Sequence, residues 1–543
     1  MSNSKHVFHV SMKENYYRDS LQLLKISDAL KHSDGIVEAV VIMGTETNKQ
    51  LLTRLGFISL ELSKAKDTDM VIAIRALDEQ SLKKGLIKFD EILEGAQTNL
   101  SQKERVRDLD SALVALPNTN LAVVSIPGEY ARDISFKIID KGIHLHLFSD
   151  HVPIEDELEI KKYALEKHVL VMGPGAGTVI IDGKGVGFAN VVSTGPVGLV
   201  AAAGTGLQEV SSLLDRTGIG LKHGLGVGGN DPKEKIGGLM MLESIKMLEK
   251  YDDIKVVGII SKPPSPSVQN KLFNYIVNET RKKYAIAFIG GVKLEIPKEH
   301  QQRIIQTNTL HSATLAIAKH MSEETFRRAS KEISIPSQEL VGLIKKESEK
   351  LAKKQSYIRA LYTGGTLAYE SQIILREIFD GIFSNEPIEG IKKLPDSFKS
   401  QEHTIVDLGD EEFTQGRPHP MIDPTIRKLK IIEEARDENV AVILMDFVLG
   451  YGSNPDPVGA LIDKIVEAKE IAEKNGRYLS IVASVCGTRK DPQGYDKSVE
   501  RLKAAGALVM PTNALAVIAA GSIASRGSME LEELYSKFLT TGE

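Results

Sequence analysis

Short apolar runs alternate with longer, charge-rich amphipathic stretches along most of the chain. Runs rich in Val, Ile and Leu are typical of strands buried on both faces, as strands are in parallel sheets, and the stretches between them have the polarity of surface helices. The pattern predicts an α/β protein built from parallel strand–helix–strand units. We expect strands at Ala39–Met43, Val71–Arg75, Leu121–Ile126, His144–Phe148, Leu170–Met172 and Val197–Ala201.

Two regions depart from this alternation. Ser322–Gln355 is the most charged and least punctuated segment, which favours one or two exposed helices that join the two halves of the chain. Phe379–His403 mixes Gly, Pro, Ser and charged residues. We interpret it as an insertion or a mobile loop.

The segments on either side of the charged linker are related by an internal duplication. VGLVAAAGTGLQE at Val197–Glu209 aligns with IRALYTGGTLAYE at Ile358–Glu370, and each reads as a strand, a Gly-Thr turn and a helix that carries Glu. The repeat predicts two related flavodoxin-like domains that face each other with the carboxyl ends of their strands. Three further pairs follow in the same order: Gly226–Asp231 with Asp407–Asp410, Val256–Ser267 with Val440–Pro457, and the run ending at Gly291 with the run ending at Thr488.

The two glycine turns are candidate anion sites. A turn from a buried strand into a helix presents unpaired N–H groups and the positive end of the helix dipole. Glycines remove the Cβ atoms that would block the approach of an anion, and threonines add hydroxyl donors. The alternative is that the glycines only permit tight packing of helix on strand. The residues concerned are Gly204, Thr205, Gly206, Gly364, Gly365 and Thr366.

Other polar residues follow predicted strands. The loop FTQGRPHPMIDP, stiffened by three prolines, holds Arg417, His419 and Asp423, which suit the binding of a polar substrate and acid–base chemistry; a packed turn with a capping Asp is the alternative. Lys262 and Arg489 each lie near a strand end and suit a carboxylate or a phosphate, with a solvated surface residue as the alternative.

Composition narrows the class of protein. A chain of 543 residues is too long to fold around one hydrophobic core, so its length predicts three or four domains. The net charge of −5 and scattered basic residues argue against a nucleic-acid partner. The single cysteine, Cys486, excludes an intrachain disulfide and a cysteine metal cage, and His144 and His146 alternate across a strand, so we expect no metal site. No apolar run approaches a membrane span and no signal peptide is evident, which indicates a cytoplasmic protein.

The motifs GGTLAYE, GRPHPMIDP and MGPGAGT resemble the FdrA proteins over essentially the whole chain. That family is similar to both subunits of succinyl-CoA synthetase. The resemblance implies a Rossmann-like, CoA-binding-like domain and two flavodoxin-like ligase domains. Five segments follow: an N-terminal α/β domain at 1–115, the Rossmann-like domain at 116–192, the first ligase-like domain at 193–321, a helical linker at 322–356, and the second ligase-like domain at 357–543 with an insertion at about 379–403.

This chain also departs from succinyl-CoA synthetase. The phosphorylated histidine of that enzyme has no clear counterpart, because His300 lies in an unlike polar context. Lys262 replaces the glutamate that would hold a phosphohistidine, and a cation there favours a free anion instead. No ATP-grasp domain and no Gly-rich CoA loop is evident. We therefore expect that the chain alone does not carry out ATP-dependent thioester synthesis and requires no cofactor of its own.

The resemblance implies a subunit of an oxamate-type carbamoyltransferase, which converts oxalurate and phosphate into oxamate and carbamoyl phosphate in purine and allantoin nitrogen catabolism. In this hypothesis the glycine turns bind phosphate and carbamoyl oxygens, Lys262, Arg417 and Arg489 hold the substrate carboxylate, and His419 and Asp423 manage protons. One alternative is an acyl-CoA synthetase component that uses CoA and a nucleotide-binding partner; another is a non-catalytic scaffold subunit. We expect companion subunits, with a homodimer as the second arrangement.

Overall fold

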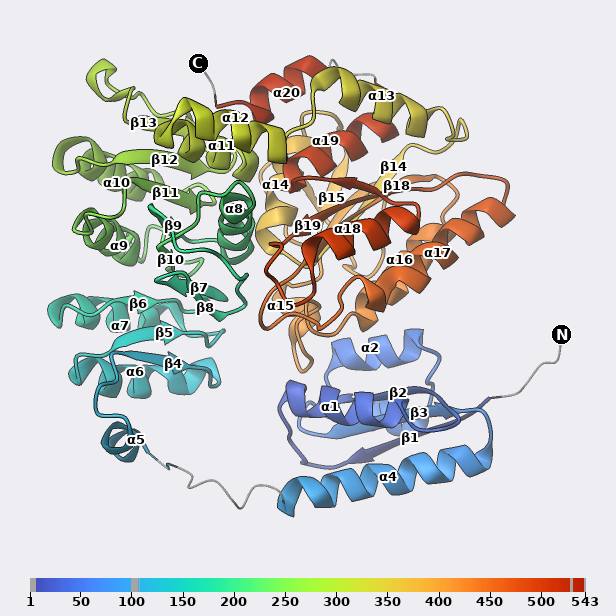
Figure 1. The fold of residues 1–543 in the computed structure, drawn as a ribbon. Helices are drawn as coiled ribbons and strands as arrows, with labels where there is room; N and C mark the ends of the chain where they lie inside the picture. The colour runs from blue at the N-terminus through green and yellow to red at the C-terminus, as the bar shows by residue number, and fades with distance from the viewer. Residues whose placement is uncertain (1–5, 99–105, 107, 528–530, 542–543) are drawn as a thin grey trace. The chain divides into compact units, whose positions relative to one another are not determined.

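The structure is a computed structural model that describes residues 6–98, 106, 108–527 and 531–541. The chain divides into two units (Figure 1). The first unit combines Met1–Ala112 with Leu408–Leu429, and the second combines Leu113–Asp407 with Lys430–Glu543. Among the described residues no helix has both the length and the apolar character needed to cross a membrane.

The first unit contains a three-stranded sheet with the order β1-β3-β2, in which both neighbouring pairs are antiparallel. The strands predicted at Ala39–Met43 and Val71–Arg75 are present as β2 and β3, but the parallel pairing expected for them is wrong. Apolar side chains cover both faces of this sheet, so an antiparallel pair shows the continuous apolar runs usually typical of parallel strands. The elements are β1 (Val7–Lys13), α1 (Ser20–Lys31), β2 (Ile36–Met43), α2 (Glu46–Arg54), α3 (Leu60–Lys64), β3 (Met70–Ala76), α4 (Glu79–Thr98) and, from the later segment, α15 (Glu411–Thr414).

The second unit begins with a small parallel sheet of order β4-β5-β6. The next hairpin, β7 and β8, fell within the segment 116–192 in the sequence analysis. In the structure β7 pairs antiparallel with β10 and extends the following sheet. The elements are α5 (Leu109–Ala115), β4 (Leu121–Val124), α6 (Ala131–Asp140), β5 (His144–Leu147), α7 (Ile154–Glu166), β6 (Val171–Met172), β7 (Thr178–Ile181) and β8 (Lys184–Gly187).

The first repeat is a flavodoxin-like domain. Its parallel strands have the order β10-β9-β11-β12-β13, which is the 2-1-3-4-5 arrangement of flavodoxin-like folds. The elements are β9 (Val197–Ala201), α8 (Gly204–Arg216), β10 (His223–Gly226), α9 (Leu239–Glu249), β11 (Val256–Ser261), α10 (Pro266–Glu279), β12 (Lys283–Phe288), β13 (Ile304–Thr307) and α11 (Leu310–Met321).

The second repeat has the same topology, with the order β17-β14-β18-β19-β20, so the predicted duplication of two α/β domains is confirmed. The predicted linker forms two helices, and the insertion adds two short strands to the edge of the sheet. The elements are α12 (Glu323–Ile333), α13 (Ser337–Ser348), β14 (Tyr357–Tyr362), α14 (Gly365–Leu375), β15 (Ile382–Ser384), β16 (Lys392–Lys393), β17 (His403–Asp407), α16 (Thr425–Arg436), β18 (Val440–Val448), α17 (Gly459–Lys474), β19 (Ser480–Cys486), α18 (Tyr495–Ala504), β20 (Leu508–Met510), α19 (Asn513–Ala524) and α20 (Leu531–Leu539).

One hydrophobic core spans both repeats. Helices α8 and α11 of the first repeat pack against α14 and α19 of the second, and α8 and α14 lie side by side between the two sheets (Figure 1). Helix α19, with the sequence NALAVIAAGSIA, is buried along its whole length. Both α8 and α14 are buried along nearly their whole length, and the apolar side chains that they contribute belong to this shared core, through which the two domains pair.

Candidate functional site

The duplicated turns meet directly. The backbone N–H of Thr366, in the first turn of α14, donates to Oγ1 of Thr205 in the first turn of α8, at 3.1 Å. A Cβ atom at Gly206 would lie 2.9 Å from Cγ2 of Thr366, and one at Gly364 would lie 3.0 Å from Cγ2 of Thr205. A side chain at either position would therefore crowd the threonine of the opposite helix start, and glycine lets the two starts approach this closely.

The start of α14 already carries a carboxylate of the chain itself. Asp446, at the end of β18, accepts the N–H of Thr363 at 2.9 Å, the N–H of Gly364 at 2.8 Å and the hydroxyl of Thr363 at 3.0 Å. A Cβ at Gly365 would lie only 2.6 Å from Oδ2 of Asp407, at the end of β17. A substrate anion at this turn would meet two negative charges at close range.

The start of α8 lacks these carboxylates. The sheet registers place Gly226 and Ile260 where the second repeat has Asp407 and Asp446. No side chain caps α8, Gly204 is exposed, and a Cβ at Gly204 would meet no atom within 4 Å. Of the two duplicated turns, the α8 turn is the one that an anion from solution can approach.

Two buried glutamates cross between the repeats one turn further along. Glu370 of α14 accepts the N–H of Leu310, the first residue of α11, at 2.7 Å. Glu209 of α8 accepts the N–H of Asn513, the first residue of α19, at 3.3 Å. Each repeat thus caps the helix that follows the fifth parallel strand of the other, with a carboxylate placed at the positive end of a helix.

The carboxyl of Glu370 is also bound by Asn513, whose Nδ2 donates to Oε2 at 2.8 Å. Burial raises the pKa of Glu370 to about 7. Burial also raises the pKa of Glu209, against the effect of Arg216, which lowers it. Charged forms are costly here because the groups are buried and the two carboxyls repel each other. Near neutral pH Glu370 is therefore partly protonated.

The neighbouring thiol is not a nucleophile. Cys486 is buried at the end of β19, and burial together with Glu209 raises its pKa well above that of an ordinary cysteine. A buried, protonated thiol is chemically inert.

The predicted cations occupy different surroundings. Lys262 is exposed, and its Nζ lies 4.9 Å from the ring centroid of Tyr369, on α14 of the other repeat. Arg489 pairs with Glu332 at 2.8 Å and with Asp496 at 3.3 Å, with its side chain 48% exposed. Its guanidinium is thus already held by two carboxylates. Substrate binding by either residue stays a prediction.

The remaining predicted residues, Arg417, His419 and Asp423, lie in the first unit. Oδ1 of Asp423 accepts the N–H and the hydroxyl of Thr425, at 3.0 and 2.6 Å, where α16 begins. This is the contact expected under the alternative prediction, a packed turn with a capping Asp. Nδ1 of His419 accepts the N–H of Met421 at 3.2 Å, and burial lowers the pKa of His419 to about 4. Its imidazole is therefore neutral near pH 7, and a catalytic role for either residue stays a prediction.

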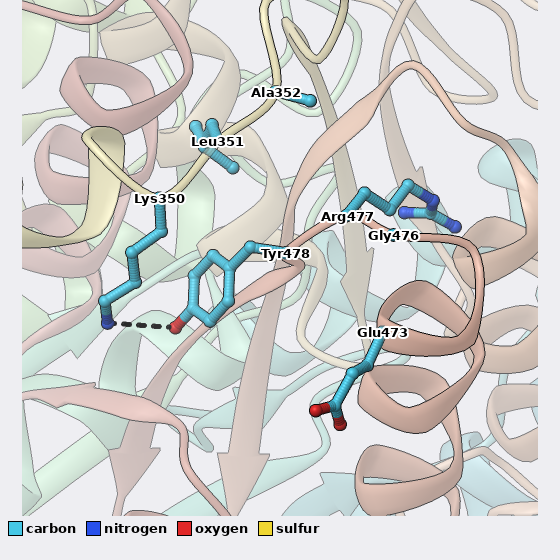
Figure 2. A pocket seen from close by; sticks show the side chains of 7 residues that line it. All are labelled: Lys350, Leu351, Ala352, Glu473, Gly476, Arg477 and Tyr478. Atoms are coloured by element: carbon cyan, nitrogen blue, oxygen red, sulfur yellow. Dashed lines mark hydrogen bonds between the residues drawn. The ribbon is translucent and has the colours of Figure 1, made fainter.

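A surface hollow of about 400 Å³ lies elsewhere in the second unit, and Figure 2 shows Lys350 directed at the hydroxyl of Tyr478 across it. Lys350 also pairs with Glu347 at 2.6 Å. No residue predicted from the sequence lines the hollow, which is formed by Lys350, Leu351, Ala352, Glu473, Gly476, Arg477 and Tyr478.

The fold is that of a multi-domain α/β protein with a CoA-ligase-like second repeat. The CoA-ligase family matches residues 361–523, from β14 into α19. Protein YahF of Escherichia coli strain K12 is 38% identical over 500 residues, which cover 92% of this chain and 95% of YahF. The chain belongs to the YahF family.

More distant relatives cover parts of the chain. The α subunit of the ADP-forming succinate–CoA ligase of Methanothermobacter thermautotrophicus is 26% identical over 197 residues, 35% of this chain and 65% of that subunit. The structure of ATP citrate lyase from Methanothrix soehngenii has 16% identity, covers 42% of each chain and gives a TM-score of 0.34.

The N-terminal domain matches a family described as AllF, heavy metal-associated domain, over residues 4–108. These residues include no cysteine, the soft ligand that heavy metals prefer. Within the described ranges, no group of three or more His, Cys, Asp or Glu is placed to hold a metal ion. The described residues of this domain therefore do not fit a cysteine-ligated heavy-metal site.

Sequence reasoning missed the groups that complete the site. The repeat alignment placed Glu209 over Glu370 but gave no sign of the helices that they cap. Asp446 lies 83 residues beyond Thr363, inside an apolar strand. The one signal of a role for Asp446 in the sequence was an acidic residue within a run that is otherwise apolar and expected to be buried.

Proposed function

We propose that this chain is a component of an acyl-CoA synthetase-like enzyme that transfers an acyl group between CoA and phosphate, together with a nucleotide-binding partner. The proposal is supported by the CoA-ligase match to the second repeat and by the relatedness to a succinate–CoA ligase α subunit. The observation that carries it is the α8 start, an uncapped helix terminus on the inner side of a ligase-type domain pair.

The proposed chemistry uses this helix start as an anion holder. Free N–H groups at the beginning of α8 stabilise the oxygens of a phosphate or an acyl phosphate without a basic side chain. Lys262, which projects from the first repeat against α14, adds a positive charge on that side of the repeat interface. Asp446 keeps the α14 turn rigid, so that the two helix starts stay in register.

A second candidate is carbamoyl transfer, with oxalurate and phosphate giving oxamate and carbamoyl phosphate. It is favoured by the surroundings of His300, whose Nδ1 accepts Nε–H of Arg303 at 3.3 Å. A guanidinium that donates to this nitrogen occupies its lone pair and opposes the use of Nδ1 of His300 as a phosphate carrier. Carbamoyl transfer needs no phosphohistidine, and it too passes through a mixed anhydride with phosphate.

The two candidates are separated by assays of the chain purified with its co-expressed partner subunits. The first predicts CoA-dependent turnover of ATP or ADP, and the second predicts phosphate-dependent release of carbamoyl phosphate from oxalurate in the absence of nucleotide. If neither activity is found in the complete complex, and inorganic phosphate does not protect the chain against thermal unfolding, both candidates are wrong and a scaffold role is favoured.

A further inference from the structure

Arg417 lies in the first unit, where the N-terminal domain holds the segment that contains it. Nδ2 of Asn48, in α2, donates to the carbonyl of Gly416 and to the carbonyl of Met43, both at 2.9 Å. Oγ1 of Thr45 donates to the carbonyl of Gln415 at 3.5 Å. The N-terminal domain therefore fixes the backbone immediately before Arg417.

Glycine is needed at this contact. Gly416 has φ +71°, and a Cβ there would lie 2.9 Å from Cγ2 of Thr45 and 3.1 Å from Nδ2 of Asn48. After Arg417 the backbone turns back, because the N–H groups of Ile422 and Asp423 donate to the carbonyl of His419 at 2.8 and 3.0 Å. The position of Arg417 is thus defined from both sides.

The guanidinium of Arg417 lacks a counter-ion in the described part of the chain. The residue is 5% exposed; Nε donates to the carbonyl of Phe413, while Nη1 and Nη2 are buried and bond to none of the described residues. Asp423 is the charge that stabilises it at longer range, but the carboxylate of Asp423 is bound at the start of α16. Burial lowers the pKa of Arg417 to about 10, so the side chain still carries its charge at neutral pH.

A buried arginine elsewhere in the chain shows the usual solution. Arg359, 2% exposed, pairs with Glu434 at 2.8 Å and with Asp437 at 2.7 Å. A buried charge without such partners is strongly unfavourable, and a guanidinium offers two parallel N–H donors that match one carboxylate. Nη1 and Nη2 of Arg417 provide the two donors of such an ion pair, but no carboxylate among the described residues accepts from them.

We propose that Arg417 is the binding site of a small carboxylate, which pairs with Nη1 and Nη2 when the loop around it opens, and that the N-terminal domain serves to position this site. A singly charged carboxylate fits better than a phosphate dianion, because one positive charge is available and Asp423 is nearby. The proposal concerns binding in the first unit and does not depend on the reaction proposed above.

The test is titration calorimetry of the full-length chain with the singly charged carboxylates oxamate and acetate, and with inorganic phosphate, as probes. We expect at least one of the two carboxylates to bind, with an affinity about 10- to 100-fold lower in Arg417→Met, the loss typical of a charged hydrogen-bonded partner. Arg417→Lys keeps the charge but loses the two parallel N–H donors of the guanidinium, so its affinity should fall between those of the wild type and Arg417→Met. Asn48→Ala should weaken carboxylate binding because the loop that carries Arg417 is no longer held in place.

Arg327→Met is the matched control, because Arg327 is an arginine of α12 with its side chain 79% exposed, and its affinity should equal that of the wild type. Thermal unfolding supplies a second readout: the carboxylate should raise the unfolding temperature of the wild type but not of Arg417→Met. Three results would each overturn the proposal: neither carboxylate binds, Arg417→Lys binds with the same affinity as the wild type, or only phosphate binds.

Discussion

The surroundings of one glycine at each helix start distinguish the two starts. Gly204 has no atom within 4 Å of its Cβ position, whereas the corresponding Gly365 faces the carboxylate of Asp407. The same residue type thus serves two purposes: at 365 it avoids a steric clash, and at 204 it leaves a helix start open to solvent.

Gly204→Ala should separate stability from anion binding. We expect a gain of about 0.4–1 kcal/mol in the free energy of unfolding, because alanine reduces the freedom of the unfolded chain and meets no neighbour. Protection of the chain by inorganic phosphate should fall, because the methyl group covers the N–H groups. Gly342→Ala, in the exposed middle of α13, is the control: it should gain stability and keep the protection. Equal protection in both variants would place the phosphate elsewhere.

Glu370 should give the stability of the chain a pH dependence near neutrality. Its pKa is raised by burial from 4.5 in the unfolded chain to about 7. A carboxyl raised in this way favours folding when protonated, so its contribution is lost as pH rises from about 4.5 through 7, in total about 3 kcal/mol by linkage. The measurement is the denaturation midpoint between pH 5 and 8. Glu370→Gln should reduce the slope in this range, whereas the exposed Glu339→Gln should not; identical slopes would contradict the assignment.

At the scale of elements, Asn513 connects helices of both repeats. Its Nδ2 donates to Glu370 and to the carbonyl of Leu367 at 3.1 Å, and its Oδ1 accepts the hydroxyl of Tyr362 at 3.0 Å. Its backbone N–H belongs to the first turn of α19, which Glu209 caps. Helices α8, α14 and α19 therefore meet at one residue: α14 contacts the side chain of Asn513, and Glu209 of α8 contacts its backbone N–H.

Removal of that side chain should loosen the packing of α14 against α19 within the second repeat. Asn513→Ala leaves buried acceptors and a hydroxyl without partners, and we expect a loss of about 3 kcal/mol in the free energy of unfolding. Amide hydrogen exchange should accelerate in α14 and α19 at the same time. In Asn278→Ala, where an exposed asparagine donates only to its own helix, the change should stay within about 0.5 kcal/mol. A similar loss in both variants would mean that the contact is not special.

At the scale of the molecule, the small sheet β4-β5-β6 is joined to the first repeat by a buried ion cluster. Nζ of Lys161, in α7, donates to Glu157 at 2.7 Å, to Asp231 at 2.9 Å and to the carbonyl of Val227 at 3.0 Å. Asp231 also accepts the N–H groups of Met240 and Met241 in the first turn of α9. The cluster fixes α7 to the loop after β10.

Lys161→Ala should weaken this connection. Removing one partner leaves two buried carboxylates uncompensated, which costs about 3–5 kcal/mol. Limited proteolysis should then cut within α7 and around β6 before it cuts the ligase-like repeats. Lys162→Ala changes the adjacent, exposed lysine and should leave the cleavage pattern unaltered. If both variants resist proteolysis as the wild type does, the small sheet is held by other contacts.

Much of the fold was accessible from the sequence. All six predicted strands are present, because a continuous apolar run in the sequence indicates a strand that is buried on both faces. The internal repeat also located both glycine turns. The direction of β2 against β3 was not accessible, because burial on both faces produces the same run in either pairing. The sequence also did not show to which sheet the β7–β8 hairpin belongs, because that depends on the pairing of β7 with β10 in the tertiary structure.

For the candidate site, the sequence by itself determined which backbone could hold an anion, since glycine, threonine and a strand-to-helix turn are local features. Only the tertiary structure decided which turn stays open: Asp446 fills one helix start from a distant strand, and Ile260 at the equivalent position leaves the other unfilled. It also gave Glu209 and Glu370 their partners and left the Nη pair of Arg417 without a carboxylate among the described residues. Charge compensation depends on distances of a few ångströms between residues far apart in the chain, and no local pattern encodes those distances.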